Sequence, residues 1–317
     1  MTGPPESFRT ILDATLALYG LMALGAVLRR LKWLTAEADA SLIRLNVQVL
    51  MPCLILSKLP GNPALDRTQD LLLAPLAGFA TIAVGLLIAY GAAGPLAGLR
   101  TAHDRRTFAF IVSVYNFGYI PVPLVQMFGT PEALGLLFLF NLGVDVAVWT
   151  LGLAVLTGGE KRFSARNLIT PVTLTIPFAL ILHYVNAVAW MPPFVVRGVD
   201  MLGQCTVPLA LLTIGASAFD LVRSEASTLT FGRAAGVSCL LRLAVIPAIF
   251  IGAAWLMPID LGLRDVLLVQ AAMPCGVFSI LLVRHYQGNS GLSLAAAGAT
   301  WIGGLVTIPL LMRLAFR

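Results

Sequence analysis

Stretches of about 20 largely apolar residues recur along the whole chain, separated by short segments that carry charges, Gly or Pro. A stretch of this length is what a helix needs to cross the hydrocarbon core of a bilayer. The chain is 58% hydrophobic and 11% charged, whereas about 25% of the residues in soluble domains are charged. A water-soluble fold could not bury so much apolar surface. The sequence therefore predicts an all-α polytopic membrane protein with no separate soluble domain.

The apolar windows predict about ten transmembrane helices. The first window follows a weakly charged opening without a small-residue cleavage site, which indicates a retained span rather than a signal peptide. The expected ranges are 10–28, 43–59, 71–93, 107–128, 133–156, 169–190, 195–219, 233–257, 264–283 and 292–313.

The basic residues predict the orientation of these spans, because short loops rich in Lys and Arg stay in the cytoplasm. One set of alternate loops holds Arg29, Arg30, Lys32, Arg44, Arg100, Arg105, Arg106, Lys161, Arg162, Arg166, Arg223, Arg233 and Arg284. The opposite side holds Arg9, Lys58, Arg67, Arg197, Arg264, Arg313 and Arg317. This distribution places both termini outside the cytoplasm and the loop around 158–167 inside it. We expect a multi-pass protein of the bacterial inner membrane, with both termini in the periplasm.

An odd number of spans on each side of the central loop places two five-helix halves in opposite orientation. We therefore expect a first repeat over 1–157, a cytoplasmic linker over 158–168 and a second, inverted repeat over 169–317. A constant offset supports this division, since Gln48 and Pro52 map onto Gln204 and Pro208 (204 − 48 = 208 − 52 = 156). The equivalent fourth and ninth spans both have helix-breaking centres, YNFGYIPVP from Tyr115 and MPCG from Met273.

Interrupted spans at equivalent places in two inverted halves indicate the binding site of a transporter. The start of a half-helix offers free N–H donors and a positive partial charge, which suit a carboxylate. Prolines at these breaks remove backbone donors and free carbonyls one turn earlier. The alternative is ordinary proline kinks with Asn116 as a cap. The expected substrate-binding residues are Asn116, Gly118, Tyr119, Pro121, Pro123, Met273, Pro274, Cys275, Gly276, Gln48 and Gln204.

Two of these residues have an equally plain structural interpretation. Gln48 and Gln204 project from equivalent spans and could reach a substrate from the facing helices. They could also form hydrogen bonds between helices, which contribute about 0.6 kcal/mol on average in membranes. The sequence leaves both interpretations open. Tyr115 and Tyr119 likewise fit either a cavity wall or packing.

Two charged residues lie deep in predicted spans. Asp145 is in the fifth span and Arg242 is in the eighth. The number of residues from the end of each span places both near the middle of the hydrocarbon core. An unpaired charge there costs at least about 2.5–3.5 kcal/mol, so each needs a partner or water. We expect the two to form an ion pair with each other. The alternative is that Asp145 serves as a proton or cation site.

Several motifs resemble the auxin efflux carrier family, which includes plant PIN-type auxin carriers and bacterial malate and malonate permeases. Asn116, Gly118 and Pro123 match its fourth-span pattern, and the ninth span is similar in PCGVFSILLVRHY from Pro274. The seventh span resembles it in LGQCTVPLALLTIGAS from Leu202, and the eighth in Arg242 followed by Pro247. Pro121 and Phe278 depart from the family pattern.

The resemblance covers nearly the whole chain and implies a fold and a function. It implies helices 4 and 9 that cross, as in bile-acid symporters, with helices 3–5 and 8–10 moving against helices 1, 2, 6 and 7. The implied function is elevator-type secondary transport of a small mono- or dicarboxylate, auxin-like or malate/malonate-like. The implied partners are this anion, the lipid bilayer and a second copy in a homodimer, and no nucleic acid.

Other functional classes fit the sequence less well. A cation-coupled symporter of the bile-acid type calls for carboxylates near the crossing, and the interrupted cores of spans 4 and 9 have none. A membrane-embedded enzyme needs a nucleophile with a base or a metal cluster. The four cysteines, Cys53, Cys205, Cys239 and Cys275, lack the spacing of a zinc site or a redox pair. We therefore expect no cofactor, no metal site and no catalytic residue.

The distribution of basic residues makes the topology testable. A reporter fused after Arg317 should be active when it requires the periplasm and silent when it requires the cytoplasm, because the C-terminus is predicted outside. Paired fusions of both reporter types, also placed in the loop after Gly159, make the measurement. Cytoplasmic activity at Arg317 would contradict the predicted orientation.

Overall fold

The computed structural model describes residues 8–160, 164, 168–224 and 232–316. These residues form helices joined by short turns; they contain no β-strand, only an isolated antiparallel bridge between Tyr115 and Cys275. The α-helices are α1 (Phe8–Arg30), α2 (Ala36–Leu45), α3 (Met51–Lys58), α4 (Thr68–Ala93), α5 (Ala102–Ser113), α6 (Pro121–Phe128), α7 (Ala133–Ala147), α8 (Leu153–Thr157), α9 (Pro171–Tyr184), α10 (Pro193–Gln204), α11 (Thr206–Ser224), α12 (Arg233–Leu240), α13 (Ile246–Leu256), α14 (Leu261–Ala271), α15 (Val277–His285) and α16 (Ser290–Ala315).

Three pairs of these helices continue into one another through a single π-helical turn. These turns are Asn46–Leu50 between α2 and α3, Val148–Gly152 between α7 and α8, and Leu241–Val245 between α12 and α13. Within the described residues, seven helices are then long and apolar enough to cross a membrane: 8–30, 36–58, 68–93, 133–157, 193–224, 233–256 and 290–314. The prediction of an all-α polytopic membrane protein is confirmed, and the count of ten spans stays a prediction.

Large apolar side chains cover much of the outer surface. Leu87, Phe194 and Leu256 are 76%, 77% and 87% exposed. Exposed apolar surface on this scale is unfavourable in water but is normal against lipid tails. The helices therefore bury polar groups inward and leave their apolar faces outward, as a membrane protein must.

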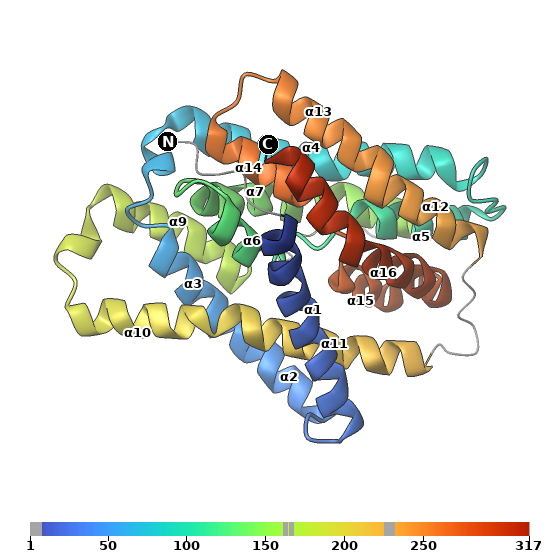
Figure 1. Cartoon of the computed structure of the whole chain (residues 1–317), viewed down its shortest axis with the longest axis horizontal. Coiled ribbons are helices and arrows are strands. Elements are labelled where there is room, and N and C mark those ends of the chain that lie inside the picture. The colour runs from blue at the N-terminus through green and yellow to red at the C-terminus, as the bar shows by residue number, and fades with distance from the viewer. Residues whose placement is uncertain (1–7, 161–163, 165–167, 225–231, 317) are drawn as a thin grey trace.

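The helices pack in two groups that lie side by side (Figure 1). We call α1, α2, α3, α9, α10 and α11 the first helix group, which occupies the lower part of the view. The second helix group consists of α4 to α8 and α12 to α16. The segment between α3 and α4, residues 59–67, passes from one group to the other.

Glycines bring helix backbones into direct contact within each group. A Cβ atom at Gly215 of α11 would lie 1.8 Å from the carbonyl oxygen of Met22 in α1. In the second group, a Cβ at Gly143 of α7 would lie 1.8 Å from the carbonyl oxygen of Pro75 in α4. Small residues permit this approach, and van der Waals packing between helices then replaces the hydrophobic effect that lipid does not supply.

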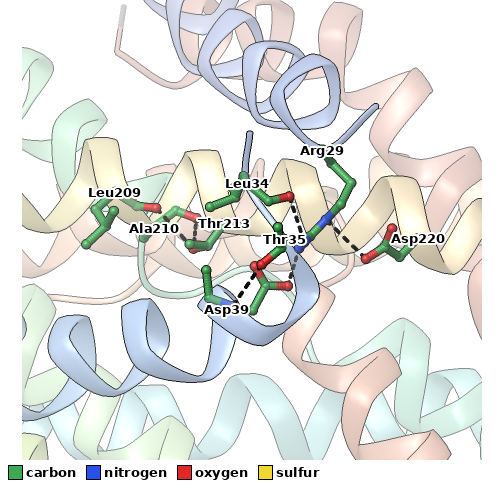
Figure 2. A network of polar contacts seen from close by, with 9 residues as sticks. Arg29, Leu34, Thr35, Asp39, Leu209, Ala210, Thr213 and Asp220 are labelled. Carbon is green, nitrogen blue, oxygen red and sulfur yellow. Dashed lines mark hydrogen bonds and ion pairs between the residues drawn. The ribbon is translucent and has the colours of Figure 1, made fainter. Parts of the chain in front are cut away.

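The ion pairs of the described residues also stay within a group or reach the connecting segment. Arg29 at the end of α1 donates to the carbonyl oxygen of Leu34 at 2.9 Å, pairs with Asp39 of α2, and lies 3.1 Å from Asp220 of α11 (Figure 2). The Arg29 side chain is only 6% exposed. It therefore joins three helices of the first group at one end.

Between helices of the two groups, the polar contact in the described residues is a neutral hydrogen bond rather than an ion pair. Tyr19 of α1 donates its hydroxyl to the carbonyl oxygen of Trp301 in α16 at 3.1 Å. No ion pair among the described residues links a helix of one group to a helix of the other. Ion pairs thus join helices within the first group, and glycine contacts bring helix backbones together within both groups.

The glycine contact between α4 and α7 gives a stability prediction. Gly143→Ala should lower the thermal unfolding midpoint by several degrees, because its new Cβ meets the backbone of Pro75 and the helices must separate. Gly252→Ala in α13 is the matched control, since a Cβ there meets nothing within 4 Å. Equal midpoints for the two variants in one detergent would contradict the close packing.

Candidate functional site

Two helices are interrupted, and their interruptions pair with each other. α5 ends at Ser113 and α6 begins at Pro121, while α14 ends at Ala271 and α15 begins at Val277. The backbone N–H of Asn116 donates to the carbonyl oxygen of Pro274 at 2.9 Å, and that of Gly276 donates to Val114 at 2.9 Å. We call the paired segments 114–120 and 272–276 the crossing.

The sequence explains why the chain leaves the helical path here. Pro121, Pro123 and Pro274 cannot donate a backbone hydrogen bond, so an uninterrupted helix would lose part of its ladder at each. At Gly276 a Cβ would lie 2.9 Å from the carbonyl oxygen of Tyr115. A side chain at that position would therefore push the two segments apart.

Side chains from neighbouring helices hold the crossing in place. Asn141 of α7 donates its amide to the carbonyl oxygen of Phe117 at 2.8 Å. Gln270 of α14 donates to the same oxygen at 3.1 Å and to the Asn141 side chain at 3.0 Å. On the other segment, Trp301 Nε1 donates to the carbonyl oxygen of Cys275 at 2.7 Å. The backbone groups freed by the breaks are thus met by protein rather than left in hydrocarbon.

Arg242 lies fully buried beneath the crossing. Its Nε donates to the carbonyl oxygen of Met273 at 2.8 Å and its Nη2 to that of Gln270 at 3.0 Å. Its guanidinium carbon lies 4.3 Å from the centre of the Tyr115 ring. Arg242 therefore satisfies the carbonyls at the end of α14, where a cation also complements the helix dipole.

The expected ion pair between Asp145 and Arg242 is wrong. Arg242 donates from Nε and Nη2 to carbonyl oxygens and lies over the Tyr115 ring, and no carboxylate pairs with it among the described residues. Asp145 of α7 instead lines a cavity, and it forms no ion pair or hydrogen bond within the part of the chain that the structure describes. Counting depth along two spans could place both charges near mid-membrane but could not tell which face of each helix they occupy.

A cavity of about 430 Å³ opens on the crossing, between the two helix groups. Helices α2, α3, α9 and α11 of the first group contribute to its wall, as do α7 and α15 of the second. Most of the wall is apolar. Its polar side chains include Asn46, Asn116, Asn141, Thr213 and Ser217, and Asp145 is the only charged residue among the described ones that line it.

The crossing places the sequence-predicted site residues in two sets. Asn116, Gly118, Tyr119 and Gly276 line the cavity. The side chain of Asn116 forms no hydrogen bond within the described part of the chain, so its amide is available to a ligand. The frame of the crossing consists of Pro121, Pro123, Met273, Pro274 and Cys275, none of which is among the cavity-lining residues.

Gln48 and Gln204 do not reach this cavity. Gln48 is exposed on the outer side of its helix, and Gln204 is exposed and donates to Asp200 at 2.6 Å. The residue that faces inward is Asn46, two positions before Gln48, whose amide donates to the carbonyl oxygen of Thr206 at 2.8 Å. Two positions amount to more than half a helical turn, so the matching offset identified the right helix and the wrong face.

Sequence reasoning also missed Asn141, Trp149 and Thr213, which all line the cavity. Asn141 and Trp149 lie four residues before and after Asp145, a spacing that puts all three on one side of the continuous helix formed by α7 and the π-helical turn after it. That spacing was the signal that could have found the first two. Thr213 lies on a helix with many small polar residues, and its hydroxyl bonds to the carbonyls of Leu209 and Ala210 (Figure 2).

The fold and the cavity define a polytopic membrane protein in which two interrupted helices meet beside an internal cavity. A family model described as a membrane transport protein matches residues 10–167 and 160–312. These matches cover nearly the whole chain, so it belongs to this membrane transport family, the auxin efflux carrier family that its motifs resemble. A comparison with curated proteins finds no match.

The separate environments of Asp145 and Arg242 give a second stability prediction. Arg242→Gln should lower the free energy of unfolding by about 2–4 kcal/mol, because buried carbonyls lose a charged donor. Asp145→Asn should leave it unchanged or raise it, since the carboxylate has no partner among the described residues and its charge is costly in the membrane. In a double-mutant cycle the two effects should add within about 0.5 kcal/mol. A coupling energy above about 1 kcal/mol would show that Asp145 and Arg242 interact and would contradict their separate environments.

Proposed function

We propose that this protein is a secondary transporter that moves a small organic anion across the bacterial inner membrane by elevator-type alternating access. The observation that carries this proposal is the crossing, which lies against a cavity between two helix groups. Interrupted helices are tolerated in a membrane where they line such a cavity or pack in protein. Membrane transporters use them as binding sites for small charged substrates.

The chemistry of the crossing favours a carboxylate as the bound group. α6 and α15 both begin at the crossing, so the positive ends of their dipoles are directed there. The first N–H groups of α15 are the backbone donors, because Pro121 and Pro123 of α6 have none and the Val122 N–H donates to the carbonyl oxygen of Gly118 at 3.3 Å. Gly118 leaves open space, since a Cβ at this position would meet nothing within 4 Å. The free amide of Asn116 adds a donor beside the break. Together these groups attract an anion without a basic side chain in contact with it.

The packing of the two groups supports relative movement. Glycine contacts hold each group internally, and ion pairs join helices of the first group. Among the described residues, the bond from Tyr19 to Trp301 is the polar link between a helix of one group and a helix of the other. In an elevator, the second helix group carries the crossing and its ligand past the first. This assignment corresponds to scaffold helices 1, 2, 6 and 7 and transport helices 3–5 and 8–10.

The spacing of elements supports an inverted five-plus-five repeat as part of the same proposal. α6 and α15 begin 156 residues apart (277 − 121), and α7 and α16 begin 157 residues apart (290 − 133). These values agree with the offset of 156 between Gln48 and Gln204. In this arrangement both termini are periplasmic, and the second half repeats the first upside down.

The binding site is tested by removing the free amide at the crossing. Asn116→Ala should weaken carboxylate binding by roughly ten- to a hundredfold, because a lost hydrogen bond to a charged group costs about 1.5–3 kcal/mol. Folded yield should stay near wild type, since the side chain bonds to nothing else in the described chain. The measurement is ligand-induced thermal stabilisation with malate, malonate and indole-3-acetate, followed by uptake into proteoliposomes.

Gln48→Ala is the matched control, because Gln48 is an exposed amide on a helix that lines the cavity with other residues. It should bind and transport like wild type. Unchanged affinity in Asn116→Ala, or an equal loss in both variants, would contradict a carboxylate site at the crossing.

A further inference from the structure

The cavity contains a carboxylate, Asp145, to which an organic anion offers no group of opposite charge. Asp145 is partly buried, lines the cavity and has no hydrogen bond or ion pair within the described chain. Ionisable residues inside membrane proteins normally pair or serve a ligand pathway. A purely anionic substrate beside this carboxylate would be repelled by it, whereas a ligand with a positive group would be attracted.

Aromatic rings stand next to this carboxylate. Trp149 lies four residues beyond Asp145, in the π-helical turn that follows α7, and also lines the cavity. Its ring meets that of Phe278 from α15 edge to face, with centroids 6.4 Å apart. Phe278 is 45% exposed although it lies next to the start of α15, at the crossing. A carboxylate together with the rings of Trp and Phe is the chemistry that binds substituted ammonium groups.

The carboxylate and the crossing have a fixed separation along α7. Asn141 is tied to the crossing by its bond to the carbonyl oxygen of Phe117. Asp145 follows one turn later, or about 6 Å along the helix, and Trp149 follows in the next, π-helical turn. A ligand that joins the two places must carry its charges at opposite ends of a short chain. An α-amino acid, with both charges on neighbouring atoms, is too compact.

We propose that the substrate is an ω-ammonium carboxylate. Its carboxylate binds at the crossing beside Asn116, and its positive end lies between Asp145 and the rings of Trp149 and Phe278. This inference rests on the proposed function and adds a second charge of opposite sign to the substrate. An inorganic cation fits the site less well, because such ions take about six oxygen ligands or more and Asp145 is the one carboxylate among the described cavity residues.

The test uses two ligands of the same shape that differ in one charge. They are 4-(trimethylammonio)butanoate and 5,5-dimethylhexanoate, in which a carbon replaces the ammonium nitrogen. Binding to the detergent-purified full-length chain is measured by thermal stabilisation over a concentration series. The ammonium compound should bind at least tenfold more tightly. In Asp145→Asn this preference should fall to less than threefold, while the affinity for 5,5-dimethylhexanoate stays equal or increases.

A second pair of variants separates the aromatic contribution from general damage. Trp149→Leu should reduce the affinity for 4-(trimethylammonio)butanoate severalfold and leave 5,5-dimethylhexanoate within twofold, because only the cation interacts with the ring quadrupole. Trp190→Leu is the matched control, since Trp190 is 69% exposed and does not line the cavity. It should leave both affinities unchanged.

The possible outcomes separate this inference from the proposed function. Equal binding of the two ligands, with loss of both in Asn116→Ala, keeps the carboxylate site and overturns the ammonium site. An Asp145→Asn protein that keeps its ligand preference but loses the pH dependence of uptake also overturns it, in favour of a proton site at Asp145. Binding of neither ligand, together with no response to malate, malonate or indole-3-acetate, overturns the proposed function as well.

Discussion

The mutual pairing of two broken backbones is the interaction on which the rest of the structure depends. A helix cannot end inside a bilayer unless its freed N–H and C=O groups find partners. Here the bonds from Asn116 to Pro274 and from Gly276 to Val114 give each segment the other as its partner. Neither break is stable alone, so the two must fold together. The close approach that this requires explains a glycine at position 276.

The charged and amide side chains near the crossing share one structural role, which is to donate hydrogen bonds to backbone carbonyls. Arg242 binds the carbonyls at the end of α14, and Asn141 and Gln270 bind the carbonyl of Phe117. Each replaces a backbone partner that the broken helix has lost. Arg242 and Gln270 lie outside the cavity wall, whereas Asn141 lines it together with Asn116 and Asp145. The positive charge of Arg242 is therefore part of the scaffold of the site and lies outside the cavity wall.

The cavity combines two kinds of charge recognition in one space. Backbone N–H groups and helix dipoles favour an anion at the crossing, and a lone carboxylate beside aromatic rings favours a cation one turn away. Because the cavity lies between two helix groups that are each tightly packed, ligand contacts add to the weak polar contacts across the boundary. The occupant of the cavity thus influences how the groups sit against each other.

The sequence by itself determined the membrane environment, the apolar helices and the places where two of them break, because hydrophobic length and proline chemistry are local properties. It also identified Asn116, which stands directly beside such a break. Only the tertiary structure decided that Arg242 binds carbonyls, that Asp145 faces a cavity and that Asn46 rather than Gln48 points inward. These outcomes depend on helix rotation and on which helices become neighbours. The depth of a residue in its span and the offset between repeats give no information on helix rotation or on neighbouring helices. Both are counts of positions along the chain, and neither says in which direction around the helix axis a side chain points.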